Sequence, residues 1–148
     1  MAHQGYIDAN VDRLDELLRA VVSGLDSPQT RLALWLIEAF DFAPLPAWPI
    51  GRQSPLMGST SELAGFGQQI DFSAIDTATL IMMLTAEEHL DCQIMHLEIE
   101  VQGSVQFAAY DYFESIAFGT AFSLDWLDAL KADGVIWGYQ LFDNSRPG

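Results

Sequence analysis

Four residues that could bind a metal or act as nucleophiles lie close together in the sequence: His89, Asp91, Cys92 and His96. Their spacing matches neither a paired-cysteine zinc site nor the His-Glu-x-x-His pattern of zinc hydrolases. Cys92 beside a histidine could also form a nucleophile pair, although acidic surroundings work against the thiolate that such chemistry needs. We therefore expect no metal site and no cofactor, and a buried structural role for Cys92.

Glu98 and Glu100 form a second candidate pair, because side chains two residues apart on a strand lie on the same face. Paired carboxylates can act as general acid and general base. No cleft is indicated around them, so we expect a solvated strand face instead. The chain also lacks the P-loop, the Gly-x-Ser-x-Gly motif and the Gly-x-Gly-x-x-Gly motif. We therefore predict a protein that is not an enzyme.

The charge of the chain is strongly acidic and unevenly distributed. Among 148 residues, 21 are Asp or Glu and 6 are Lys or Arg, so the formal net charge is −15. Residues 53–130 contain no Lys or Arg but twelve acids. This balance argues against direct binding of nucleic acid or of an anionic membrane. It favours a basic protein partner, with solubility alone as the other interpretation.

Length and composition predict one domain over residues 1–148, with loose termini at 1–7 and 143–148. Half of the residues are hydrophobic, which is enough for a sizeable core. No stretch is long and apolar enough for a transmembrane helix, and the N-terminus does not resemble a signal peptide. Because Cys92 is the only cysteine, we expect no intrachain disulfide and a cytoplasmic location.

Hydrophobic periodicity predicts helices in the first part of the chain. Apolar residues recur at three- and four-residue spacings over residues 8–25. Ser27 and Pro28 resemble an N-cap and a first helical residue, which would start a second helix that ends near Phe40. The short loop between the two segments predicts an antiparallel helical hairpin, with Trp35 on its second helix.

The middle of the chain gives weaker signals. Four prolines predict an irregular segment over residues 43–58, which we expect to cover the core. Short helices are expected within 59–69 and within 85–92, the second because of its capping-box spacing. Residues 77–84 could form a strand or a helix, and their length and β-branched start favour the strand.

The clearest local signal is the alternation of apolar and polar residues from Ile94 to Ala109. A three-residue loop over 102–104 would place Ile99 opposite Phe107 and keep the apolar side chains on one face. A break at Asp111 and three further elements follow: a strand over 113–119, a helix over 124–133 between Ser123 and Gly134, and a strand over 135–142. The expected fold is α+β, a helical hairpin followed by an antiparallel sheet of about four strands with one late helix.

The segment from His96 to Ser115, HLEIEVQGSVQFAAYDYFES, resembles small acidic bacterial immunity proteins, the inhibitors encoded beside polymorphic or contact-dependent toxins. Several such families carry a hairpin of the form H-x-E-I-E, a glycine turn, and F-x-A-Y-D-x-F. The acidic helix that follows fits the same resemblance. It implies a non-enzymatic protein that binds a toxin domain, often a basic nuclease, and blocks its active site or substrate groove.

We therefore predict an inhibitor or adaptor whose acidic face binds a basic protein. Tyrosines between acids offer the contact area and hydrogen bonds common at interfaces. Two alternatives are a small enzyme with a pocket under the proline-rich segment, and a homo-oligomer that pairs through an edge strand or exposed aromatic side chains. The expected partner-binding residues form two patches, the first of Glu98, Glu100, Tyr110, Asp111, Tyr112 and Glu114, and the second of Glu87, Glu88 and Asp91.

Overall fold

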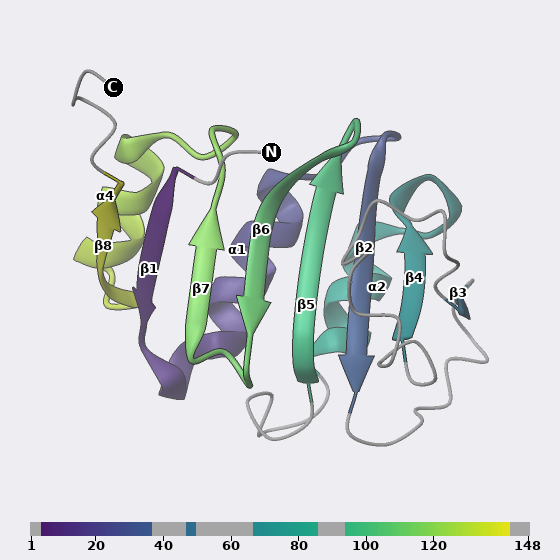
Figure 1. Cartoon of the computed structure of the whole chain (residues 1–148), viewed down its shortest axis with the longest axis horizontal. Coiled ribbons are helices and arrows are strands. Elements are labelled where there is room, and N and C mark those ends of the chain that lie inside the picture. The colour runs from purple at the N-terminus through teal and green to yellow at the C-terminus, as the bar shows by residue number, and fades with distance from the viewer. Residues whose placement is uncertain (1–3, 37–46, 50–66, 86–93, 143–148) are drawn as a thin grey trace.

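The computed structural model of the chain describes residues 4–36, 47–49, 67–85 and 94–142 (Figure 1). Within these residues, eight strands form one sheet in the order β3-β4-β2-β5-β6-β7-β1-β8, and every neighbouring pair is antiparallel. The strands are β1 (Gly5–Ala9), β2 (Thr30–Leu36), β3 (Ala47–Pro49), β4 (Gly67–Asp71), β5 (Ile94–Val101), β6 (Ser104–Tyr110), β7 (Ser115–Phe118) and β8 (Ile136–Leu141).

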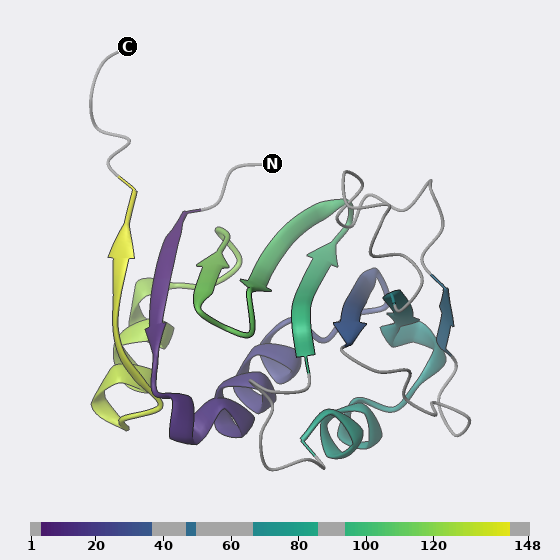
Figure 2. The same ribbon diagram turned by 60° about the horizontal axis from the view of Figure 1, so that its bottom comes forward.

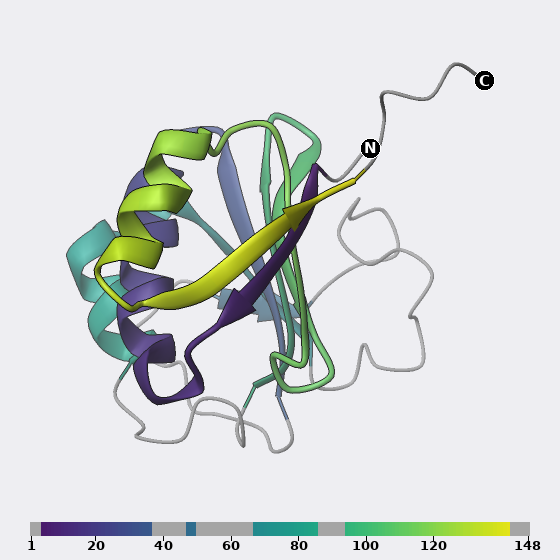
Figure 3. The same cartoon turned by 90° about the vertical axis from the view of Figure 1, so that its left-hand side faces the viewer.

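Three α-helices in the described residues cover one face of this sheet: α1 (Leu14–Gly24), α2 (Thr77–Leu84) and α4 (Leu124–Ala132) (Figure 3). Figure 2 shows α4 under the β8 end of the sheet, α1 under its middle and α2 toward the β4 end. None of these helices is long and apolar enough to cross a membrane. The core lies between the helices and the sheet, where Leu17, Val21, Ile99 and Phe107 are fully buried.

The prediction of a helical hairpin followed by about four strands is therefore wrong, although the chain does combine helices with an antiparallel sheet. The sheet has eight described strands, and β1 precedes the first helix. β1 also lies partly within residues 1–7, which we expected to be a loose terminus. A 3-10 turn, Val11–Arg13, separates β1 from α1, so the helix begins later than the periodicity suggested.

The second arm of the expected hairpin is the strand β2. Leu32 and Leu34 face the helices, while Ala33 and Trp35 are buried on the opposite face. A strand buried on both faces shows no alternation between apolar and polar residues, so its sequence is easily mistaken for a helix. Ser27 caps a turn rather than a helix, because its hydroxyl accepts the Gln29 N–H at 3.2 Å.

Residues 77–84 show the opposite error, because they form the helix α2 where a strand was favoured. Leu80 and Leu84 are buried one helical turn apart, and α2 packs against α1. Met82 lies on the exposed side of the helix, so apolar residues occur on both of its sides. That composition removes the periodicity which normally distinguishes a helix from a strand.

The predicted β5–β6 hairpin is confirmed, but its turn is shorter than expected. The turn has two residues, Gln102 and Gly103, with φ angles of 53° and 84°. A β-bulge then places Gln106 between the pairs Glu100–Val105 and Ile99–Phe107. The bulge compensates for the shorter turn, so Ile99 still lies opposite Phe107 as predicted.

The late helix and the last strand also agree with the sequence. The Ser123 hydroxyl accepts the Trp126 N–H at 3.1 Å, which caps α4 as predicted. Gly134 follows the helix with a φ of 80°, and β8 comes next. Leu127 is buried as expected, but Leu124 is exposed rather than inward-facing.

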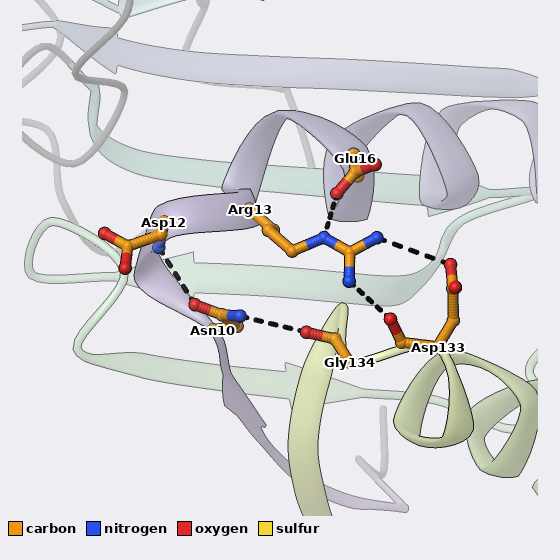
Figure 4. Close-up of polar contacts among 6 residues, drawn as sticks. All are labelled: Asn10, Asp12, Arg13, Glu16, Asp133 and Gly134. Atoms are coloured by element: carbon orange, nitrogen blue, oxygen red, sulfur yellow. Dashed lines mark hydrogen bonds and ion pairs between the residues drawn. The ribbon is translucent and has the colours of Figure 1, made fainter.

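Polar contacts join the start of α1 to the end of α4 (Figure 4). The Asn10 side-chain amide donates to the Gly134 carbonyl at 3.0 Å. The Arg13 guanidinium donates to the Asp133 carbonyl and forms ion pairs with the Asp133 and Glu16 carboxylates. Two loops more than a hundred residues apart are therefore held together beside β1 and β8.

Parts of the middle segment lie outside the described residues. β3 is the described portion of the proline-rich segment 43–58. The predicted helix within 59–69 falls mostly outside, but Gly67–Gln69 belongs to the strand β4. The predicted helix within 85–92, together with Cys92, also lies outside, apart from Thr85 at the C-terminal end of α2.

The contact between β1 and β8 gives the first testable prediction. A Cβ atom at Gly5 would collide with the Gln140 carbonyl oxygen, so Gly5→Ala forces the two strands apart. Overpacking of this kind costs about 1–3 kcal/mol, which urea denaturation would measure. Gly138→Ala on β8 is the matched control, since its Cβ would meet no atom within 4 Å. Equal stability of the two variants would contradict the prediction.

Candidate functional site

The first predicted partner-binding patch comes from β5, from the end of β6 and from the turn after β6, and its residues lie on two different parts of the molecule. Glu98 and Glu100 are on the sheet face opposite the helices, with exposed fractions of 5% and 0%. The expectation of a solvated strand face is therefore wrong for both carboxylates. Glu98 lies between Ala33 and Ala108 on the neighbouring strands, and these small side chains leave room for it.

Glu100 is neutralised by the neighbouring strand. It lies directly opposite Arg31 of β2, and the guanidinium forms an ion pair with its carboxylate. A buried carboxylate is tolerated only when a partner compensates for its lost hydration. Asp71 of β4 lies opposite Arg31 on the other side, so the arginine is flanked by acids on both neighbouring strands.

Glu98 is held by Tyr110, whose phenol group donates a hydrogen bond to the carboxylate. Burial raises the pKa of Tyr110, and the hydrogen bond with Glu98 and its negative charge raise it further. The phenol therefore stays protonated and remains a donor near neutral pH. The Tyr110 ring also contacts His96 edge-on, with ring centroids 5.7 Å apart. His96 thus connects this buried pair to the end of the hairpin.

The turn after β6 is attached to β5 through the backbone. The Asp111 N–H donates to Nδ1 of His96 at 3.2 Å, and the Tyr112 N–H donates to the Met95 carbonyl at 3.0 Å. Because Nδ1 accepts, the imidazole is neutral and carries its hydrogen on Nε2. Burial lowers the pKa of His96, and the nearby Asp111 carboxylate opposes that shift.

The backbone of this turn is strained. Asp111, Tyr112 and Phe113 have successive φ angles of 53°, 59° and 69°. The left-handed conformation costs non-glycine residues about 1–2 kcal/mol each, so three in a row require strong support. The contacts with His96 and Met95 supply part of it, and burial of the Phe113 side chain supplies more. Such strain is concentrated at functional sites in proteins.

The strained conformation holds three polar side chains in solvent. Asp111, Tyr112 and Glu114 are exposed around the buried Phe113. Neither acid belongs to any of the ion pairs found among the described residues. We call Asp111, Tyr112 and Glu114 the acidic turn. It can offer two carboxylates and a phenol to a partner without rearranging its backbone.

The first predicted patch is thus divided between the surface and the interior. Asp111, Tyr112 and Glu114 form its accessible part, and Tyr110 supports them from the half-buried sheet face. The second patch, made of Glu87, Glu88 and Asp91, lies outside the described residues together with His89. Among the residues that are described, no group of three His, Cys, Asp or Glu side chains could hold a metal.

Sequence reasoning missed Arg31 and Trp35, because both were assigned to a helix. As strand residues, Arg31, Ala33 and Trp35 alternate with Leu32 and Leu34, and Arg31 then faces an acid on β5. If residues 30–36 had been assigned to a strand, the single base Arg31 beside the Glu98-x-Glu100 pattern of β5 would have indicated the ion pair between Arg31 and Glu100. The two acids are therefore structural, since Arg31 and Tyr110 each bind one of them.

The Arg31–Glu100 pair gives a prediction on stability. Removing one partner of a buried pair leaves an uncompensated charge and costs about 3–5 kcal/mol. Arg31 is partly exposed, so we expect Arg31→Met to lower the free energy of unfolding by about 3 kcal/mol. The double variant Arg31→Met with Glu100→Met should recover most of this loss. Arg19→Met on the exposed side of α1 is the control, expected within about 0.5 kcal/mol of the parent. A double variant no more stable than Arg31→Met would contradict the pairing.

His96 gives a prediction on pH. Its pKa in the folded protein lies below the ordinary value of 6.5, so the folded state favours the neutral ring. The resulting stability is present above about pH 6.5 and is lost as the pH falls toward the lowered pKa. The stability difference between the parent and His96→Gln should therefore shrink in acid. NMR should show the Asp111 amide responding to this titration more than the Tyr112 amide, which bonds to Met95. Equal responses would contradict the role assigned to His96.

The chain was also compared with known proteins. No protein family model, no curated protein and no solved structure matches it. Its function must therefore be argued from its own residues, in particular the acidic turn and the contacts beneath it.

Proposed function

We propose that this protein is a non-catalytic inhibitor that binds a basic protein through its acidic surface. In this proposal it acts in the cytoplasm as an immunity protein, and it covers the active site or substrate groove of a toxin domain such as a nuclease. The charge balance and the resemblance of residues 96–115 support the proposal. The conformation of the acidic turn is the observation that carries it.

The acidic turn is organised before any partner arrives. Its backbone is held by the hydrogen bonds to His96 and Met95 and by the buried Phe113 side chain. A loop that is already rigid loses little conformational entropy on binding. Tyr112 adds a partly exposed ring between the two carboxylates, and tyrosine is enriched among residues that dominate binding energy.

The surrounding charge favours a cationic partner. The described part of the chain exposes many more acids than bases, and two of its four bases, Arg13 and Arg31, are already in ion pairs. A negative field of this kind accelerates association with a basic protein at low salt. The exposed acids of the described residues are Asp8, Asp12, Asp15, Glu16, Asp26, Asp76, Asp111, Glu114, Asp125, Asp128 and Asp133.

Because Glu98 and Glu100 are buried, we assign direct contact with the partner protein to fewer residues than the sequence suggested. Asp111, Tyr112 and Glu114 would touch the partner, while Glu98 and Tyr110 would act by holding the hairpin beneath them. Glu100 is excluded from direct contact because its carboxylate is buried against Arg31. Glu87, Glu88 and Asp91 stay a proposed second patch.

The test begins with the tagged protein as bait in native cell extract at about 50 mM salt, with mass spectrometry as the readout. We expect a basic protein that is released at higher salt, because screening weakens exposed charge pairs. With the recovered partner, Asp111→Lys combined with Glu114→Lys should slow association by about tenfold or more. The same variant should fail to inhibit the partner's activity at concentrations at which the parent protein does.

A matched double variant separates a local effect from the effect of net charge. Asp15→Lys with Asp26→Lys makes the same change in net charge at exposed positions outside the acidic turn. We expect it to slow association less than the turn variant does. Equal slowing would show that only the total charge matters, and the absence of any basic partner would reject the proposed function.

A further inference from the structure

In the part of the chain that the structure describes, the strand β8 forms an open edge of the sheet. Among the described strands its only neighbour is β1. In Figure 3, which looks onto this end of the molecule, β8 lies in front of β1 and α4 lies to one side. β8 contains neither proline nor lysine, residues that commonly protect an edge from pairing with another chain.

The register with β1 shows which backbone groups of β8 face outward. The Phe142 N–H donates to the Gln4 carbonyl at 3.0 Å, and Gln140 lies opposite Tyr6. In an antiparallel ladder, alternate residues direct their N–H and C=O groups to the same neighbour. Gln140 therefore bonds toward β1, while Tyr139 and Leu141 direct their N–H and C=O groups to the open edge.

Apolar side chains are concentrated at the same edge. Trp137 is 58% exposed and Leu141 is 42% exposed on β8, and the neighbouring Tyr6 on β1 is 47% exposed. The Phe142 ring contacts the Tyr6 ring edge-on, with centroids 4.9 Å apart. An extended segment added to β8 would cover part of this surface and satisfy the outward backbone groups, as in recognition by strand addition.

A shallow hollow of about 370 Å³ lies over β1 and β8, lined by residues that include Tyr6, Asp8, Gly138 and Gln140. A Cβ atom at Gly138 would meet nothing within 4 Å, so the hollow is open above this glycine. An aromatic ring beside a carboxylate suits a lysine or arginine side chain, which can contact both. The hollow thus favours a cationic side chain from the added strand.

The strand added to β8 could come from another, basic protein or from a second copy of this chain, and the acids around β8 favour the basic protein. Asp128 of α4 accepts the Tyr139 hydroxyl at 2.7 Å, and this hydrogen bond and the nearby Asp125 both raise the pKa of Tyr139. With Asp8 on β1, three carboxylates therefore border the edge, and Lys131 is the one base on α4. A second copy of the chain, with its own net charge of −15, would bring like charges together at this edge.

We infer that β8 binds an extended, lysine- or arginine-containing segment of another protein as an added strand. This inference rests on the proposed function in one respect, namely that the partner is basic. The added strand would bond to the backbone of Tyr139 and Leu141, cover Trp137, and place one cationic side chain between Tyr6 and Asp8.

Amide hydrogen exchange, measured by NMR on the whole chain, tests this directly. The probe is a peptide of about ten residues with alternating lysine and valine, and the control peptide has glutamate in place of lysine. The lysine peptide should slow exchange at Tyr139 and Leu141 by fivefold or more. Gln140 should change little, because its N–H already bonds to β1, and the glutamate peptide should protect none of the three.

Two variants of β8 examine the edge itself. Leu141→Pro removes one outward N–H and leaves the ladder to β1 intact, a position where proline is tolerated on an edge strand. Trp137→Ser removes the exposed ring and keeps the backbone unchanged, so it remains informative if the proline variant does not fold. Both should weaken binding of the lysine peptide by about tenfold. Asp111→Lys with Glu114→Lys should weaken this binding much less than either β8 variant, because it changes only the overall charge, and this difference separates β8 from the acidic turn.

Three outcomes would overturn the inference: no protection of Tyr139 and Leu141, equal protection by the glutamate peptide, or protection that rises with protein concentration when no peptide is present. The last would identify a second copy as the occupant. Each outcome concerns β8 alone, so the proposed binding through the acidic turn would stand or fall on its own test.

Discussion

The ion pair between Glu100 and Arg31 is the interaction on which the rest of the sheet depends. It places opposite charges on β5 and β2 at one register, and a shift of one residue would turn the buried carboxylate toward the helices. Because an unpaired charge there is far more costly than a lost apolar contact, the pair selects one alignment for the centre of the sheet. The strands on either side then follow from that alignment.

Glu98, the second buried acid, connects the fixed alignment of the central strands to the protein surface. Glu98 binds Tyr110, Tyr110 contacts His96, and His96 accepts the Asp111 N–H at the beginning of the strained turn. A polar network buried in this way is stabilising only when its members are satisfied together. The interior of the sheet and the exposed carboxylates of the turn are therefore parts of one structural unit.

The elements that the sequence predicted correctly are those whose sequence shows apolar periodicity or a helix cap, even where the second face is also buried, as in β5. The β5–β6 hairpin, α4 and β8 all show clear periodicity or capping residues. β2 and α2 were assigned wrongly because apolar residues occur on both sides of each. The strand break at Asp111 was predicted, but the turn continues through Glu114 into the strand expected over 113–119, and β7 begins only at Ser115. The burial of Glu98 and Glu100 was not predicted, since it depends on pairing with β2.

The position of β1 has a consequence for folding. Its two neighbours, β7 and β8, both come from the last third of the chain, so β1 pairs only with strands far away in sequence. Closing such long loops slows folding and keeps the edge of β7 uncovered in partly folded molecules. During synthesis on the ribosome, β1 must wait until β7 and β8, which begin more than a hundred residues later, have emerged. A molecular chaperone that shields β7 in this interval would raise the yield of folded protein.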